Sequence, residues 1–272
     1  MLEEYEDALS GFRRFLQGYS KATQNTYMSV AKSFLNFLNG KPLRDVTRDD
    51  VLKFVETYDN PWSKALVFKA LKTFFVQYLE RPDPFKNVKI PAPETNVNFW
   101  VDEDKIIEAI KKEPEFRYKV LLALMYDLAL RRSEVVRIRV EDIDFDHMIV
   151  RVWVSKRRKL RAMLKPMSRL TASLLKKYLS ITGKESGELF DRLHPVSVTR
   201  IVKRMLKRVG VDFPKGLHQI TRHSRAVNMR FKNVDIADIK EFLGHSDIRS
   251  TMVYASIGSS RLAGRIPEFG SK

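Results

Sequence analysis

The chain has 272 residues, and its 50 Lys and Arg outnumber its 33 Asp and Glu to give a net charge of +17. It has no cysteine, which excludes disulfides, thiolate nucleophiles and cysteine-based metal sites. No apolar run approaches the roughly 18 residues that cross a bilayer, and the acidic opening MLEEYEDALSGF is unlike a signal peptide, so we expect no membrane partner and a cytoplasmic location.

Helical periodicity dominates the first 80 residues, with no strand-like alternation. Ser20 and Thr47 stand where two helices begin and can cap them, and Gly40 marks the end of one. Residues 1–82 are therefore predicted to form a small helical bundle. Its predicted helices span 2–16, 20–40, 48–58 and 62–80.

A proline-rich segment, 81-RPDPFKNVKIPAPETNVNF-99, follows these helices and contains four prolines with little periodicity. Each proline disfavours helix at the residue before it, so most of the segment is expected to be extended. It is predicted to be the domain boundary, with 83–98 as a linker and 99–272 as the second domain.

The second domain is predicted to be helical around one β-hairpin. The run 117-RYKVLLALMYDLAL-130 is apolar on nearly all sides, which indicates a helix at the centre of the core. Both arms of 147-HMIVRVWVSKRRKLRAML-164 alternate, which is typical of a hairpin. The fold class is therefore mainly α, with a small β-hairpin or sheet in the second domain. Helices are predicted at 102–112, 114–130, 168–182, 195–209, 218–231, 235–243 and 248–257.

Positive charge is concentrated in the second half. Residues 1–90 carry 14 Lys and Arg against 11 Asp and Glu, whereas residues 91–272 carry 36 against 22. Such an excess favours a polyanionic partner. The alternative is a basic surface that serves only solubility. A membrane surface is less favoured, because no segment is an obvious basic amphipathic anchor.

Two places in the second domain combine arginines or lysines in a way that suits phosphate binding. In 128-LALRRSEVVRI-138, two arginines follow a buried helix directly, and Glu134 can hold one of them; a surface helix start has the same pattern. The predicted hairpin tip, 155-SKRRKLR-161, contains no acid and can reach a phosphate or a groove, or can be a solvated turn.

A third place, 217-LHQITRHSRAVNMRF-231, holds two histidines close to an arginine. His218 and Arg222 lie one turn apart on the same face of the predicted helix, whereas His223 points elsewhere. No Asp or Glu lies within the segment to complete a metal site, so no metal is expected.

The fourth place is 243-LGHSDIRSTMVYAS-256, where Tyr254 follows His245 by nine residues. Taken alone, a tyrosine at this position serves packing more often than catalysis.

Together, the four places resemble the catalytic domain of the tyrosine recombinase (phage integrase) family, including Xer-like and archaeal integrase-like members. The strip 130-LRRSEVVRIRVEDIDF-145 looks like the first arginine box, and 222-RHS-224 looks like the second. The segment 242-FLGHSDIRSTMVY-254 resembles the histidine-to-tyrosine segment. The resemblance places the catalytic residues at Arg131, Lys156, Arg222, His245 and Tyr254.

The resemblance covers roughly residues 98–256, with one departure. The family usually has His, or less often Lys, three residues before the second arginine, where this chain has Gln219. His218 stands one residue earlier. Either His218 acts from a shifted turn, or Gln219 only hydrogen-bonds the phosphate, and both alternatives stay open. Residues 1–82 are similar, with a weaker match at 23-TQNTY-27, to the family's helical core-binding (SAM-like) domain, which implies that they form a DNA-binding domain.

The resemblance implies that DNA is cut and rejoined through a 3′-phosphotyrosyl ester. Tyr254 would attack, although the ordinary pKa of a tyrosine, about 10, requires the site to help remove its proton. Two guanidiniums suit the charge that develops on the phosphate. The lysine on the hairpin, Lys156, would protonate the departing 5′ oxygen, and His245 would donate a hydrogen bond. The ester conserves the bond energy, so no metal, nucleotide or other cofactor is expected.

The implied partner is double-stranded DNA in the nucleoid, held in a clamp between the two domains. The helix 195-PVSVTRIVKRMLKRVG-210 can present a basic face to DNA, although the same face can simply be solvated while its apolar residues pack inward. The resemblance also implies a homo-tetramer on paired DNA sites, formed from monomers or dimers. The candidate DNA contacts are Arg157, Arg158, Lys159 and Arg161 at the hairpin tip and Arg200, Lys203, Arg204 and Lys207 on this helix.

Two alternatives remain beside a site-specific recombinase. A type IB topoisomerase-like enzyme uses the same Arg, Lys and Tyr chemistry to relax supercoils. A DNA-binding protein with a weakened catalytic site is the second, and it is supported by Gln219.

Overall fold

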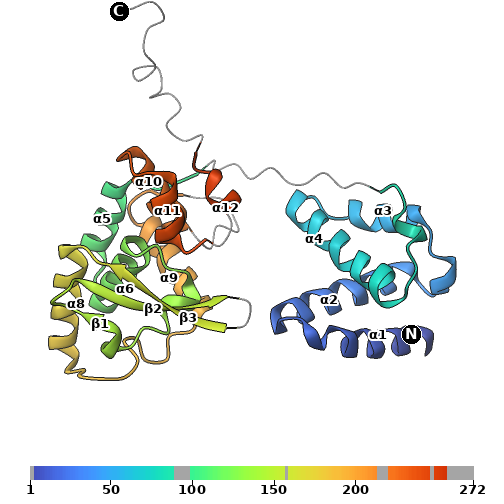
Figure 1. The fold of residues 1–272 in the computed structure, drawn as a ribbon, viewed down its shortest axis with the longest axis horizontal. Coiled ribbons are helices and arrows are strands. Elements are labelled where there is room, and N and C mark those ends of the chain that lie inside the picture. The colour runs from blue at the N-terminus through green and yellow to red at the C-terminus, as the bar shows by residue number, and fades with distance from the viewer. Residues whose placement is uncertain (1–2, 89–98, 157–158, 213–219, 246–247, 256–272) are drawn as a thin grey trace, which may run out of the picture. The chain divides into compact units, whose positions relative to one another are not determined.

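The computed structural model describes residues 3–88, 99–156, 159–212, 220–245 and 248–255. The chain divides into two compact units, Met1–Thr95 and Asn96–Lys272 (Figure 1). Within the described ranges, no helix is both long enough and apolar enough to pass through a bilayer.

The first unit is a bundle of helices. Ser20 caps α2, since its hydroxyl accepts a hydrogen bond from the backbone N–H of Thr23, and Thr47 forms a capping box with Asp50 at α3. The segment predicted as one helix over 62–80 is a helix that continues into a π-helical stretch. The elements are α1 (Glu3–Phe15), α2 (Lys21–Leu38), α3 (Arg48–Glu56), α4 (Pro61–Lys72) and the π-helix Thr73–Tyr78.

Aromatic rings fill the centre of this first unit. Phe34 is fully buried and packs edge-on against both Phe54 and Phe75. Phe12 makes a similar edge contact with Phe74. Rings in this arrangement stabilise a core beyond the area that they bury. The unit therefore holds together around apolar contacts.

The second unit surrounds helix α6 (Phe116–Asp127), whose residues are buried from Val120 to its end. The helices α5, α7, α8 and α10 pack against it, as the nearly all-round apolar run predicts. These and the remaining helices are α5 (Glu103–Lys112), α7 (Arg132–Val135), α8 (Arg169–Thr182), α9 (Pro195–Lys207), α10 (Ile220–Phe231), α11 (Ile236–Leu243) and α12 (Arg249–Met252).

The described part of the second unit contains one antiparallel sheet in the order β1-β2-β3, made of β1 (Ile143–Asp144), β2 (Ile149–Lys156) and β3 (Lys159–Pro166). The register pairs Val150 with Lys165 and Val152 with Met163, so these side chains share the face that turns to the core. The predicted hairpin is confirmed. The two-residue strand β1 was not predicted, because it is too short to show alternation.

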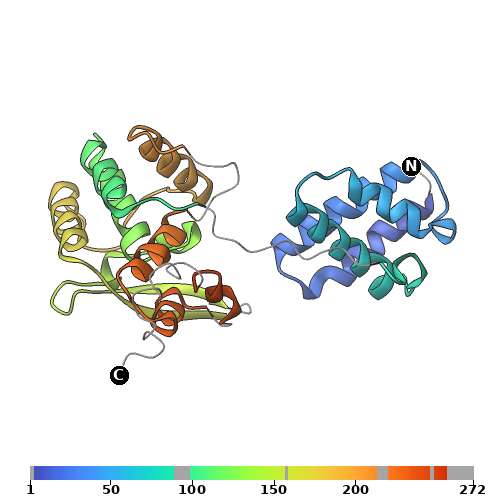
Figure 2. The ribbon, with the colours of Figure 1, turned by 90° about the horizontal axis from the view of Figure 1, so that it is seen from above.

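Two predicted helices end earlier than the sequence pattern suggests. The helix expected over 114–130 stops at Asp127, because Ala129 adopts a left-handed conformation (φ +50°) that a helix cannot contain. The helix expected over 248–257 is shortened to α12, followed by a turn. Both views of the ribbon place α11 beside the hairpin (Figures 1 and 2).

Candidate active site

Arg131 lies at the start of α7, directly after the left-handed turn. Its Nη1 donates to Oε1 of Glu134 at 2.6 Å, and its backbone N–H donates to the other carboxylate oxygen at 2.8 Å. Glu134 is buried, whereas the Arg131 side chain is 36% exposed. The carboxylate therefore fixes the arginine from behind and leaves its guanidinium partly open to an incoming group.

Arg222 lies on α10 and is 2% exposed. Its Nη1 donates to the carbonyl of Ala129 at 2.7 Å, and its Nη2 donates to the carbonyl of Leu243 at 2.5 Å. The left-handed turn at Ala129 and the end of α11 thus hold the two arms of one guanidinium. Burial, with the positive charge of Arg131 beside it, lowers the pKa of Arg222 to about 10, so it stays charged at neutral pH.

His245 follows the C-cap of α11, where Gly244 takes a left-handed conformation (φ +66°). Its Nδ1 and the Thr251 hydroxyl form a hydrogen bond of 2.9 Å, which orients the ring. Burial, together with the positive charges of Arg222 and Arg131, lowers the pKa of His245 to about 4. The imidazole is therefore neutral at pH 7.

Tyr254 lies in the turn after α12 and is 1% exposed. Its hydroxyl is 2.5 Å from Nδ1 of His223, on the turn of α10 that also carries Arg222. Burial raises the pKa of Tyr254 to about 12, and the charge of Arg222 acts in the opposite direction. A protonated phenol thus sits against an imidazole nitrogen, which is the pairing of a nucleophile with a proton acceptor.

A buried lysine, Lys165, lies in the same neighbourhood. It is on β3, is 1% exposed, and donates from Nζ to the carbonyl of Phe242 on α11. Burial, together with the positive charges of Arg222 and Arg131 and against the attraction of Glu134, lowers its pKa to about 7. The charged side chains of α7, α10 and β3 interact because these elements and the end of α11 meet around Lys165.

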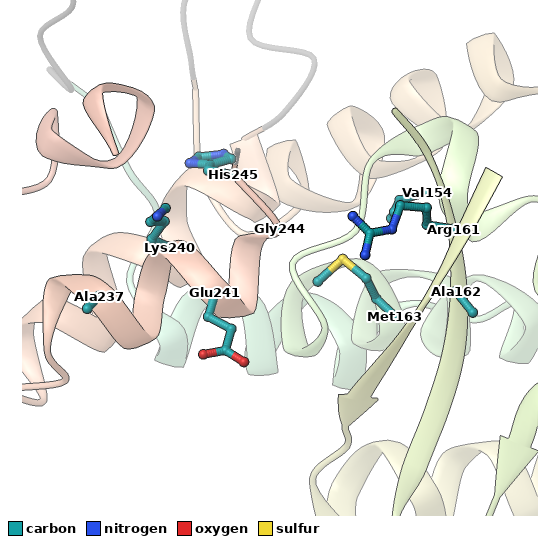
Figure 3. A pocket seen from close by; sticks show the side chains of 9 residues that line it. All are labelled: Val154, Arg161, Ala162, Met163, Ala237, Lys240, Glu241, Gly244 and His245. Atoms are coloured by element: carbon teal, nitrogen blue, oxygen red, sulfur yellow. The ribbon is translucent and has the colours of Figure 1, made fainter. Parts of the chain in front are cut away.

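A cleft of about 510 Å³ opens beside His245, between α11 and the hairpin (Figure 3). Arg161 and Met163 reach into it from β3, and Lys240 and Glu241 line it from α11. Of the predicted DNA-contacting residues, Arg161 thus lines the same cleft as the predicted catalytic histidine. Among the residues that the structure describes, no three His, Asp and Glu side chains gather as metal ligands would.

The side chains of several predicted site residues lie outside the described part of the structure. Lys156 ends β2 and pairs through its backbone with Lys159, but the side chains of both lie outside the described set. The other predicted residues outside the described ranges are Arg157, Arg158, His218 and Gln219.

The predicted DNA-contacting residues of α9 have different surroundings. Arg200 and Lys207 are exposed, and Lys203 is half-buried. Arg204 stacks over the ring of Tyr118 at 5.2 Å and lies 3.9 Å from the buried Glu113 carboxylate, so it also packs on its own unit.

Sequence reasoning missed two groups of this neighbourhood. His223 was expected to point away, yet its Nδ1 lies 2.5 Å from the Tyr254 hydroxyl, because α11 packs against both α10 and α12. Lys165 lies one residue beyond the predicted hairpin, 147–164, and was not predicted as a site residue. Strand alternation places Lys165 on the same face as Met163. A lysine on this inward face could have indicated a buried cation.

The comparison with protein families gives two matches. Residues 101–260 match the phage integrase family, and residues 6–84 match the N-terminal SAM-like domain of phage integrases.

Similar proteins give a consistent result. A tyrosine recombinase XerA of Pyrococcus horikoshii is 30% identical over 276 residues, which cover 96% of this chain and 90% of that protein. The structure resembles the XerH site-specific recombinase bound to its difH substrate, with a TM-score of 0.73 and 18% identity over 97% of this chain and 84% of that one. It also resembles a lambda integrase dimer bound to a COC′ core site, with a TM-score of 0.72 and 18% identity over 89% and 95% of the two chains.

Proposed function

Because the chain belongs to the phage integrase family, we propose that Tyr254 is the nucleophile with which it cuts and rejoins DNA. The chain is a tyrosine recombinase, an enzyme that acts on specific DNA sites. These catalytic roles are assigned to particular residues because the residues lie close enough together to interact. Arg131, Arg222, His245 and Tyr254 come from four segments and act on one another electrostatically.

The chemical step begins with the phenol of Tyr254. Its oxygen attacks the scissile phosphorus, and its proton passes to Nδ1 of His223, which lies 2.5 Å away. The bond from phosphorus to the 5′ oxygen breaks, and Lys156 on the hairpin protonates that oxygen. The product is a 3′-phosphotyrosyl ester with a free 5′ hydroxyl, and the reverse attack by a 5′ hydroxyl rejoins the strand. This sequence uses no metal or ATP.

The phosphate charge is met by two guanidiniums and one neutral imidazole. Arg222 is rigidly held by the carbonyls of Ala129 and Leu243, so little reorganisation is needed when charge develops. Arg131 is held by Glu134 in the same way. If the Thr251 hydroxyl donates to Nδ1 of His245, the other ring nitrogen carries the proton that is donated to the phosphate.

The nucleophile is buried in the protein without DNA. At 1% exposure, the Tyr254 hydroxyl cannot meet a phosphate unless the segment around α12 moves. We therefore infer that binding of DNA moves the segment around α12 so that Tyr254 reaches the phosphorus while its hydroxyl stays within hydrogen-bond reach of Nδ1 of His223. Until then burial would keep the phenol protonated, because it raises the pKa of Tyr254 to about 12.

The partner is DNA, and the finer points of its binding are part of the proposal. Residues 1–82 and 99–272 would act as DNA-binding and catalytic domains that close around a duplex through the linker 83–98. The exposed Arg200 and Lys207 would contact phosphates. A homo-tetramer on paired sites, assembled from monomers or dimers, and a cytoplasmic, nucleoid-associated location follow from this role.

A topoisomerase-like activity is not favoured, because the similar proteins named above are recombinases and integrases. A weakened catalytic site would rest on Gln219 alone. The pairing of Tyr254 with His223 supports an active nucleophile instead.

The test is covalent capture of DNA. A pool of nicked duplexes with randomised arms is incubated with the protein and resolved on a denaturing gel, because the nick traps the cleaved intermediate. We expect a covalent adduct with the natural chain, and none with Tyr254→Phe. The matched control is Tyr118→Phe, which keeps the ring under Arg204 and should leave the adduct unchanged. Absence of an adduct with the natural chain, or its persistence in Tyr254→Phe, contradicts the proposal.

A further inference from the structure

Lys165 occupies a position that lysines rarely tolerate. Its side chain is 1% exposed, and its partner across the sheet is the fully buried Val150. The ammonium nitrogen donates to the carbonyl of Phe242 and lies 4.4 Å from the centre of the Phe242 ring. It therefore sits on the carbonyl end of α11, where the helix dipole favours a cation.

The same end of α11 receives a second cation. Arg222 donates to the carbonyl of Leu243, so the last two carbonyls of the helix bind two different cationic side chains. Beyond this end the chain turns through Gly244 to His245. The position of the histidine thus depends on how these two cations hold the helix end.

Strand β3 touches this turn at a second point. A Cβ atom on Gly244 would lie 2.7 Å from the sulfur of Met163, so the strand approaches as closely as a glycine permits. Met163 and Lys165 point to the same face of β3. The strand therefore positions the turn by contact at Met163 and by a hydrogen bond at Lys165.

We propose that Lys165 is a positioning residue of the cleavage site: it holds the carbonyl end of α11 so that His245 meets the phosphate, and it takes up a proton when the phosphate arrives. This inference rests on the proposed DNA cleavage. It gives a role to a cation that lies outside the family-like motifs, on a strand facing the two catalytic arginines.

The proton uptake follows from the charges around the ammonium. Arg222 and Arg131 repel it, and Glu134 attracts it. Burial and this repulsion lower the pKa of Lys165 to about 7, so much of it is neutral above that pH. A phosphate between the arginines offsets their repulsion and favours the charged lysine.

The other titratable groups near Lys165 lie on or after α11. Asp238 and Glu241 line, together with Lys165, a second cleft of about 450 Å³ between α11 and β3. Both are carboxylic acids, whereas His245 is neutral at pH 7. None of them reverses the effect of an added phosphate, because all are present both before and after DNA binds.

The first test measures cleavage by Lys165→Met, which keeps the length of the side chain and removes the charge. We expect the covalent adduct to form about 10- to 100-fold more slowly, since a charge-assisted hydrogen bond that orders the site is lost. The melting temperature should not fall, because an apolar side chain replaces a buried cation. Lys111→Met, at an exposed lysine of α5, is the matched control and should change neither rate nor melting temperature.

The second test measures proton uptake on DNA binding, by calorimetry at pH 8 in buffers of different ionisation enthalpy. It uses Tyr254→Phe, which cannot cleave, with and without Lys165→Met, and a duplex selected by covalent capture or, failing that, the randomised pool. We expect uptake that Lys165→Met abolishes.

A wild-type cleavage rate in Lys165→Met, a slow rate with a melting temperature several degrees lower, or unchanged proton uptake would each overturn the inference. The two proposals fail separately. If the natural chain forms no adduct, yet Tyr254→Phe shows proton uptake that Lys165→Met abolishes, the cleavage is contradicted and the phosphate-linked lysine stands.

Discussion

The two units of this chain differ in the number of polar side chains that they bury. Among the described residues, the first unit buries one polar side chain, Thr73, and otherwise packs aromatic and aliphatic groups. The second unit buries eleven polar or charged side chains, including Lys165 and Arg222. Buried cations cost stability unless they are paired, so their presence marks the unit in which binding or chemistry takes place.

The difference also shows in what holds each buried group. Phe34 is surrounded by rings and needs no polar partner. Arg222 needs two backbone carbonyls, and one of them is supplied by the left-handed turn at Ala129. Burying a cation in this way lowers stability unless such partners are present. We therefore expect substitutions in the second unit to change mainly the cleavage rate, and substitutions in the first unit to change mainly the free energy of unfolding.

The largest effect is expected for Arg222→Ala. It should slow formation of the covalent adduct by about a thousandfold or more, since one preorganised charge donor is removed from the phosphate. DNA binding, measured by gel shift, should change little. The matched control is Arg151→Ala, at an exposed arginine on the outer face of β2. Strong loss of binding in Arg222→Ala would mean that this residue positions the DNA instead of acting on the reacting phosphate.

A large effect on stability is expected for Phe34→Ala in the first unit. Removing a fully buried ring should lower the free energy of unfolding of that unit by about 3–5 kcal/mol. Hydrogen exchange measured by mass spectrometry should show the loss in peptides of the first unit. Phe37→Ala is the control, because Phe37 is 42% exposed. Equal loss of protection in both units would contradict their separate cores.

A smaller effect, on pH dependence, should appear in the second unit. The pKa of Lys165 is about 7 in the folded chain and 10.5 ordinarily, so between these values the unfolded chain binds more protons. Stability should therefore rise with pH from 7 to 9, by at most about 1.4 kcal/mol per pH unit. The pKa of His245 is about 4 in the folded chain and 6.5 ordinarily. Stability should therefore fall as the pH drops from about 6.5 to 4, because the unfolded chain binds more protons there.

Urea unfolding followed by tryptophan fluorescence measures this dependence. In a Trp62→Phe background the remaining tryptophans, Trp100 and Trp153, report on the second unit. Lys165→Met should flatten the rise between pH 7 and 9. A slope that survives this substitution would assign the titration to another group.

Much of this architecture was predictable from the sequence. Caps at Ser20 and Thr47, the apolar run that became α6 and the alternating hairpin arms are local patterns, and the structure confirms each. The family resemblance and the mainly α fold class are likewise confirmed. The left-handed turn at Ala129 was not predictable, because alanine carries no signal for it.

The residues of the site were easier to predict than the contacts between them. Arg131, Arg222, His245 and Tyr254 were identified from the family resemblance, whereas the roles assigned to them remain predictions. The contact of His223 with Tyr254 depends on the path of the chain after α11, which no local pattern encodes. The burial of Lys165 depends on how closely β3 meets α11.

The central claim is that Tyr254 itself carries the DNA. The most direct measurement digests the covalent adduct with nuclease and protease and identifies, by mass spectrometry, the peptide that retains a nucleotide phosphate. The proposed mechanism predicts a single modified peptide containing Tyr254, with the phosphate attached to the 3′ side of the cut strand. A nucleotide on any other tyrosine, or attachment through the 5′ end, would contradict it.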